Sequence, residues 1–233
     1  MSIRATNRGQ VSTNITPFVR LGNSVDEIPR QNLALWLRAD RGVVLDTTST
    51  PTVSQWLDQS GNGRHATESI KTDQPTLASD ASTGKPFIYF RQQSLITSTS
   101  FQIAEVFVVF RSPTATFNNY GSPISGYESA LARTFIPEVG STTLHGNPFP
   151  IAVRRNGVVI LSPYQMSPIT SFMTLAVEVN NPELPRSYIL GCLEQKAFKN
   201  NLDIAEVIAY SSVQNTTIKQ KIETYLKGKY QHY

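Results

Sequence analysis

The sequence predicts an all-β fold: a two-sheet antiparallel sandwich with one C-terminal α-helix and an extended N-terminal arm. Short apolar segments recur at intervals of ~8–15 residues between Pro, Gly and Asn, which is typical of a sandwich. A single stripe of helical spacing lies near the C-terminus. The 233 residues fit one such domain, because sandwiches often run to ~200–250 residues undivided.

The strands are predicted in chain order from their apolar patterns. Leu33, Leu35 and Leu37 alternate with Ala34, Trp36 and Arg38, which indicates a half-buried strand with a large aromatic on its second face. The segment 101–110 is apolar on both faces, as in a central strand. Further strands are expected at Phe87–Phe90, Phe172–Val179, Arg186–Leu193 and Leu202–Tyr210.

A hairpin and a helix have specific local signals. Asn156-Gly157 divides the apolar segment 151–161, and this pair tolerates the positive φ angles of a type I′ turn. Asn215 is a suitable N-cap for a helix from Asn215 to Lys227, with Gly228 close to the expected stop. The apolar stripe of this helix consists of Ile218, Ile222, Tyr225 and Leu226.

Residues 1–32 differ from the domain predicted at 33–233. They are rich in Ser, Thr, Asn and Arg and show no sustained period of two or 3.6, so we expect an extended arm. Such an arm can bind a partner by lying along the edge of its sheet. The apolar positions expected to anchor it are Val11, Ile15, Phe18 and Val19.

Three blocks carry a resemblance to a known family. They are Leu33–Asp40, Val53–Ala66 and Asp203–Tyr210, the last followed by the predicted helix. In this order, over about residues 33–230, they resemble the LamG-like jelly-roll family of concanavalin A-like sandwiches. The resemblance implies a fold and no single function, because lectins, enzymes, adhesins and structural modules share that sandwich. The residues of the signature, interpreted as structural, are Trp36, Trp56, Asp58, Gly61, Gly63, Glu206 and Tyr210.

The segment from Asp58 to Gly63 invites a calcium hypothesis. Calcium prefers about six to eight oxygen ligands with several carboxylates, and this segment offers one. We therefore expect Asp58 to cap a tight turn in which Gly61 and Gly63 adopt positive φ, and we expect no metal and no cofactor.

Aromatic residues could form a sugar-binding surface. Trp36 and Trp56 lie in apolar strand contexts and are expected to fill the core. Better candidates for an exposed surface are Phe117, Tyr120 and Tyr127, in a segment broken by Pro and Gly.

Catalysis is disfavoured by the placement of the acids. Glycoside hydrolysis needs two carboxyl groups that face one cleft. Asp203 and Glu206, three residues apart on one strand, should point to opposite faces. Glu105 and Glu178 each stand alone among apolar residues, and a buried Glu105 or Glu206 is expected to be bonded to neighbouring backbone or side chains. The three His residues are dispersed, and no nucleophile elbow or phosphate loop is present, so we predict a protein that is not an enzyme.

Charge and cysteine usage restrict the partners and the compartment. The net charge of +4 is spread along the chain, which disfavours a nucleic-acid role. Cys192 has no second cysteine to pair with. The N-terminus lacks the apolar run of a signal peptide, and no apolar segment approaches the ~18 residues of a membrane span. We expect synthesis in a reducing cytoplasm.

These observations predict a structural protein. A small sandwich with an arm suits a virion component of a tailed bacteriophage, either a capsid decoration (cement) protein or a tail-associated protein, made in the host cytoplasm. Its partners would be other capsid or tail subunits, including copies of itself in a homo-oligomer. The alternative is a lectin-like module for host-surface glycans, which would be extracellular by a signal-independent route.

Overall fold

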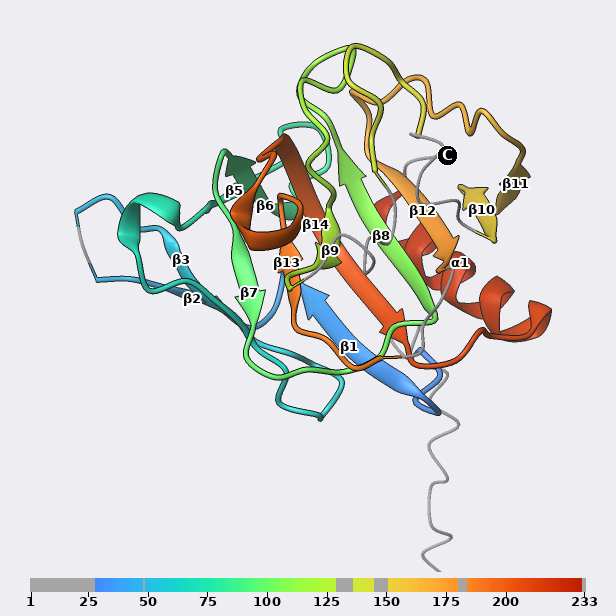
Figure 1. Ribbon diagram of the computed structural model, residues 1–233, viewed down its shortest axis with the longest axis horizontal. Helices are drawn as coiled ribbons and strands as arrows, with labels where there is room; N and C mark the ends of the chain where they lie inside the picture. Colours follow the sequence, from blue (N-terminus) through green and yellow to red (C-terminus); the bar gives the residue numbers. More distant parts are fainter. Residues whose placement is uncertain (1–27, 48, 129–135, 145–150, 180–183, 232–233) are drawn as a thin grey trace, which may run out of the picture.

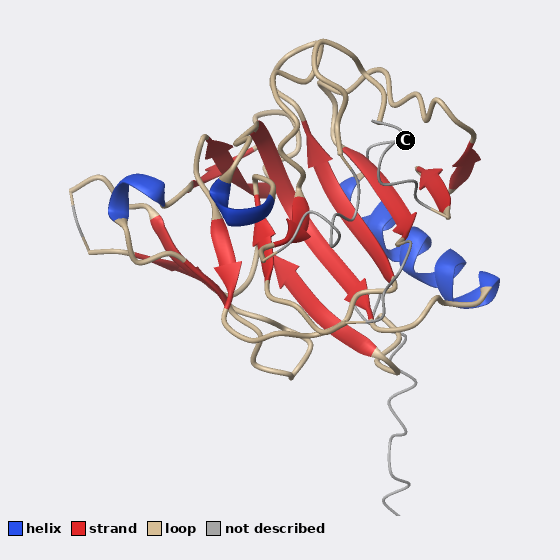
Figure 2. Cartoon of the chain, in the orientation of Figure 1, coloured by secondary structure: helices blue, strands red, loops and turns tan. Residues whose placement is uncertain are grey.

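The computed structural model describes residues 28–47, 49–128, 136–144, 151–179 and 184–231. Two antiparallel sheets and one long C-terminal helix make up the fold (Figures 1 and 2), which confirms the predicted all-β sandwich. The predicted arm positions Val11, Ile15, Phe18 and Val19 lie outside the described residues.

The large sheet has eight strands and the small sheet has six. The large sheet runs in the order β11 (Val158–Ile160), β10 (Ala152–Arg155), β12 (Met173–Glu178), β8 (Glu105–Arg111), β14 (Asn201–Tyr210), β6 (Pro86–Arg91) and β5 (Thr76–Ser79), and β1 (Leu33–Arg38) also pairs with β14. The small sheet runs β2 (Val43–Leu45), β3 (Val53–Trp56), β4 (Ala66–Thr67), β7 (Leu95–Thr97), β13 (Tyr188–Leu190) and β9 (Ile124–Gly126). The helices within the described residues are the 3₁₀ segments η1 (Lys71–Asp73) and η3 (Glu194–Lys196) and the α-helix α1 (Thr216–Tyr230).

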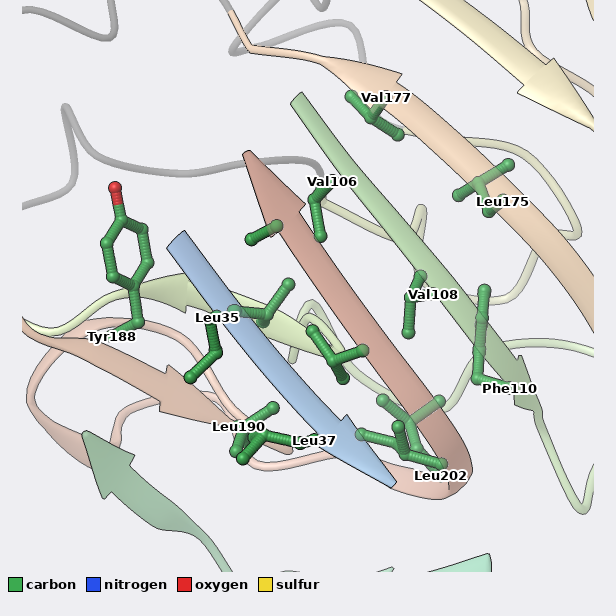
Figure 3. Close-up of a cluster of buried hydrophobic side chains, with 14 of the residues drawn as sticks. Leu35, Leu37, Val106, Val108, Phe110, Leu175, Val177, Tyr188, Leu190 and Leu202 are labelled. Carbon is green, nitrogen blue, oxygen red and sulfur yellow. The ribbon is translucent and has the colours of Figure 1, made fainter. Parts of the chain in front are cut away.

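The main core lies between the two sheets. Alternate residues of the central strand β8, such as Val106, Val108 and Phe110, point into it beside Leu35 of β1 (Figure 3). Leu190 of β13 reaches the same cluster from the small sheet. Alternation along each strand therefore delivers one set of side chains to this core.

A second apolar cluster lies on the outer face of the large sheet, beneath α1 (Figure 1). Ile222 and Leu226 of the helix pack there against Trp36, Phe107 and Ile208 of three strands. Every residue of β1 is consequently buried. The expectation of a half-buried β1 was wrong, because α1 covers the face that was assigned to solvent.

The helix confirms its predicted start and extends past its predicted end. The Asn215 side chain accepts a hydrogen bond from the Ile218 N–H at 3.0 Å. The helix continues through Gly228 to Tyr230, and the left-handed cap is Gln231, with φ 51°. Hydrogen bonds from Lys229 and Tyr230 to Glu206 hold this last turn on the sheet, so tertiary contacts override the glycine stop signal.

The predicted hairpin is confirmed by positive φ at both turn residues, 50° at Asn156 and 81° at Gly157. The apolar segment 101–110, predicted as one central strand, forms a strand only from Glu105, where β8 begins. Phe101 forms only an isolated bridge with Arg186.

A β-bulge in β14 changes which residues share a face. Ile204 pairs with Phe110 and Glu206 pairs with Val109, so Ala205 is an extra residue on this strand. The bulge shifts the alternation by one position. Asp203 and Glu206 therefore lie on the same outer face of the large sheet, which corrects the prediction that they point to opposite faces.

Candidate functional site

The signature loop around Asp58 is a turn held by one carboxylate. Asp58 accepts hydrogen bonds from the N–H groups of Trp36 at 3.0 Å, Ser60 at 2.9 Å and Arg64 at 3.0 Å. The φ angles of the two glycines at positions 61 and 63 are 96° and 71°. The predicted capped turn is confirmed, and it fixes the middle of β1, at Trp36, against the loop.

Metal ligands do not gather in the part of the chain that the structure describes. No group of three or more His, Cys, Asp or Glu side chains in these residues is close enough to hold an ion. Asp58 itself has its oxygens engaged by the turn.

Both tryptophans are buried, as expected. The Trp56 indole N–H donates to the Arg38 carbonyl at 2.8 Å, and the Trp36 indole N–H donates to Glu206 at 2.6 Å. The guanidinium groups of Arg30 and Arg38 lie 4.8 and 5.2 Å from the Trp36 ring. Neither indole is available as a platform for a sugar.

Glu206 is the centre of a buried polar cluster under α1. Besides Trp36, its carboxylate accepts hydrogen bonds from Tyr225 at 2.8 Å, Tyr230 at 2.7 Å and Lys229 at 2.7 Å. Lys229 also reaches Asp40 at 2.9 Å. Four donors satisfy the carboxylate, so it acts as an anchor for the helix.

Asp40 and Arg38 form the outer part of this cluster. Arg38 donates two hydrogen bonds to Asp40, at 3.1 and 2.8 Å. Burial alone would raise the pKa of Asp40, but its hydrogen bonds with Arg38 and Lys229 hold it well below its usual range. The Asp40 carboxylate therefore stays charged and paired.

A second pair of acids lies where β8 and β12 meet. Glu105 and Glu178 are directly opposite each other in the register, so the expectation that each stands alone was wrong. Lys219 of α1 pairs with both, and the Gln214 N–H donates to Glu105 at 2.8 Å. Burial raises the pKa of Glu105. The expectation that neighbouring groups satisfy Glu105 is confirmed.

Asp203 occupies a third cluster on the same face of the large sheet. It accepts hydrogen bonds from Arg91 and Arg111, both at 2.8 Å, and Arg111 reaches Asp80 at 2.7 Å. Hydrogen bonds from the Ser82 hydroxyl and the Thr83 backbone and side chain, which outweigh the effect of burial, hold the pKa of Asp80 well below its usual range.

A cavity of about 330 Å³ lies beside this third cluster. Its walls include Arg111, Lys85, Phe172 and Tyr230. Arg111 donates hydrogen bonds to Asp203 and Asp80. The nearby residues Asp203 and Glu206 are both buried. No pair of free acids faces this cavity among the described residues.

The predicted exposed aromatic surface does not form as expected. Phe117 is fully buried in the main core, where its segment bridges Val139. Tyr120 is half-buried and packs edge-on against Phe198 at 5.8 Å. The Pro and Gly punctuation indicated a loop correctly, but this loop folds back over the open end of the core.

The outer face of the small sheet carries a polar groove of about 520 Å³. Its floor is a cross-strand row in which Gln55 pairs with Thr67 and Thr67 pairs with Ile96. Ser54, Ser69 and Ser98 complete its walls with Glu68 and Thr97. Sequence reasoning missed this groove, because its residues come from three strands that are separated along the chain.

Four strongly exposed apolar side chains lie in the β10–β11 hairpin and directly beside it. Val158 is 66% exposed, Val159 55%, Leu161 81% and Ile151 62%. These four belong to one eleven-residue segment at the edge of the large sheet (Figure 1). The apolar run Val158–Leu161 predicted a strand from the sequence, but the sequence did not predict that its side chains would be exposed.

Comparison with known proteins adds no identification: no protein-family model matches this chain, and neither does any curated protein sequence. Among the described residues, no helix is both long and apolar enough to cross a bilayer.

Proposed function

We propose that this chain is a non-catalytic structural subunit, a virion component of a tailed bacteriophage that decorates the capsid or belongs to the tail. In this proposal the N-terminal arm docks onto other subunits of the assembly. The observation that carries the proposal is the apolar β10–β11 hairpin, whose outer strand β11 pairs on one side only among the described residues. A stand-alone soluble domain usually protects such an edge, whereas a subunit covers it with a partner.

The state of the acids supports a role without catalysis. The carboxylates of Glu206, Asp203 and Glu105 are buried, and each is bonded to groups of the domain itself. General acid–base catalysis needs a carboxyl group within reach of a substrate. We expect no hydrolysis of β-glucan or another polysaccharide, measured as released reducing sugar.

The resemblance to LamG-like sandwiches remains part of this proposal. It suits an assembly subunit, because jelly rolls recur in viral shells as well as in lectins. Synthesis in the host cytoplasm followed by incorporation into the particle accounts for the single buried cysteine. Mass spectrometry of purified phage particles should then detect this chain at a fixed ratio to the major capsid or tail protein.

The arm is tested by a deletion whose end the structure defines. Ile28 is buried in the cluster under α1, and the Pro29 carbonyl accepts a hydrogen bond from Tyr210 at 2.8 Å. A deletion should therefore stop before Ile28 and remove residues 2–26. We expect a folded domain with an unchanged melting temperature that no longer joins the particle in a reconstitution assay.

Two outcomes of this deletion would contradict the proposal. Unfolding of the shortened chain would show that the arm belongs to the core of the domain. Normal incorporation into the particle would remove the role of the arm in docking.

The groove on the small sheet favours a second candidate function, a lectin-like module for host-surface glycans. The Gln55 amide and the hydroxyls of Thr67 and Ser69 are hydrogen-bonding groups of the kind that sugar hydroxyls engage. A glycan array should then give binding that Gln55→Ala abolishes and that the hairpin variant Val159→Lys leaves unchanged. An empty array would leave the structural function as the sole proposal.

A further inference from the structure

We infer that the free edge of β11 receives the segment Gln10–Thr16 of a second copy of this chain as an added strand. This inference rests on the proposed function, and it names the partner as a neighbouring identical subunit. The contact would be head-to-tail: the arm of one subunit on the hairpin of the next. Such heterologous contacts generate rings or helical arrays.

The backbone of β11 is suited to accept a strand. Arg155 and Val158 flank the two-residue turn, and Arg154 pairs with Val159. In an antiparallel pair, positions that exchange hydrogen bonds alternate with positions that do not. The pair next to a two-residue turn exchanges them, so the N–H and C=O of Val159 point away from β10, towards the open edge.

Two other sheet edges, β5 and β2, show protection that β11 lacks. β5, at the opposite edge of the large sheet (Figure 1), exposes Thr76 and Ser79 at its two ends. β2, an edge of the small sheet, has a register irregularity between Val44 and Leu45 that interrupts regular pairing. β11 has neither device. Its open edge combines available backbone groups with exposed apolar side chains, which favours strand addition.

The segment Gln10–Thr16 has the composition of a strand. Gly9 and Pro17 bound these seven residues, and none of the seven is Gly or Pro. Val11, Thr13 and Ile15 would share one face of an extended chain. β-Branched residues predominate, which suits a pleated surface. Val158 and Val159 are adjacent and point to opposite faces, so the face with Val11, Thr13 and Ile15 could cover Val159.

Chain length is compatible with a neighbour. An extended chain from Thr16 to Ile28 spans at most ~40 Å, and a domain of ~200 residues has a radius of gyration of ~17 Å and hence a diameter of ~40 Å. The subunit's own β11 lies five strand positions from β1, about 24 Å away. The extended chain from Thr16 to Ile28 is therefore longer than the ~24 Å to the subunit's own β11, and its ~40 Å matches the distance between the centres of touching subunits. Tight packing in a particle raises the local concentration of neighbouring edges.

Cross-linking between two single-cysteine variants tests the inference in the full-length chain. Thr13→Cys places a thiol in the arm, and Val159→Cys places one on the hairpin. The native Cys192 is buried and burial raises its pKa to about 12, so it stays silent toward a bis-maleimide. We expect isotope-distinguished mixtures of the two variants to form Thr13–Val159 heterodimers in the assembled state.

A charged edge supplies the second measurement. Here the hairpin cysteine is Val158→Cys, and the yield of Thr13–Val158 heterodimers is compared with and without Val159→Lys. The lysine should lower this yield by about tenfold, because burying a valine favours binding by about that factor. Ile70→Lys is the matched control, since Ile70 is also 55% exposed but lies away from the hairpin. This control should leave the yield unchanged.

Each alternative occupant gives a different result. A chain carrying both cysteines that cross-links only within itself at high dilution, with no heterodimers in the mixture, would show that the edge takes its own arm. Val159–Val159 products would show edge-to-edge pairing of two hairpins. Either result overturns this inference, and so does the absence of cross-links. If particles still require residues 2–26, the proposed function survives these failures.

Discussion

Glu206 joins three elements at the residue scale: β14, which carries it, β1 through Trp36, and α1 through Tyr225, Lys229 and Tyr230. A buried charge is costly unless it is paired and hydrogen-bonded, and here four donors meet that requirement. The same cluster explains why the helix continues past Gly228 to Tyr230. One carboxylate thus determines both the docking and the length of α1.

We predict that Glu206→Gln lowers the free energy of unfolding by about 3–5 kcal/mol, because it removes the fully buried carboxylate that accepts four hydrogen bonds and leaves Lys229 with the partly exposed Asp40 as its counter-charge. Glu105→Gln is the matched control. It should cost less, since burial already disfavours the charge on Glu105 and Lys219 keeps Glu178 as a partner. Urea denaturation measures both. Equal losses in the two variants would contradict the anchoring role of Glu206.

Buried tyrosines make stability sensitive to high pH. Burial raises the pKa of Tyr188 to about 12, and burial together with Glu206 raises the pKa of Tyr225 and Tyr230. The unfolded chain releases these protons near pH ~10, whereas the folded chain retains them. The stability present below pH ~10 is therefore lost as the pH rises above it, by about 1.4 kcal/mol per pH unit for each tyrosine. Constant urea midpoints between pH ~10 and ~11.5 would contradict this prediction.

At the scale of elements, the strands are positioned by irregularities as much as by regular pairing. The bulge at Ala205 turns Glu206 towards α1, and the type I′ turn at Asn156-Gly157 fixes the register of the edge hairpin. The helix is fixed at both ends, by the Asn215 cap and by Glu206. The bulge, the turn and the two ends of the helix thus determine that α1 covers the outer face of the large sheet and that β11 lies at its edge.

The cap gives a prediction for the helix. Asn215→Ala should lower the free energy of unfolding by about 1 kcal/mol, because the Ile218 N–H loses its acceptor. Asn215→Asp, which keeps an acceptor, should restore most of that loss. Thermal unfolding of the two variants separates the outcomes: an alanine variant as stable as the aspartate variant would show that the cap is unimportant here.

At the scale of the whole molecule, three layers are stacked: the small sheet, the large sheet and α1. The main core and the cluster under the helix lie on opposite faces of the large sheet. A chain of this length buries about 70% of its unfolded surface without metals or disulfides. Its stability should therefore come from these two apolar layers and their buried ion pairs.

A chelation experiment tests that statement. We predict that excess EDTA shifts the melting temperature by less than ~2 °C, because the Asp58 turn is completed by protein donors. A decrease of more than ~5 °C would mean about 1 kcal/mol or more of linked metal binding and would contradict the structural reading of this loop.

The sequence alone determined the features that depend on neighbouring residues. The Asn156-Gly157 turn, the Asp58 turn and the Asn215 cap were predictable because each is built from residues a few positions apart. The all-β class was predictable for the same reason, since strand periodicity is local.

Only the tertiary structure decided which side chains face each other. The bulge at Ala205 brought Asp203 and Glu206 to one face, and strand register placed Glu105 opposite Glu178. The burial of Phe117 likewise depends on a loop that closes over the core. Pairing between distant strands sets these relations, and a one-residue shift reverses a face, so no local pattern could reveal them.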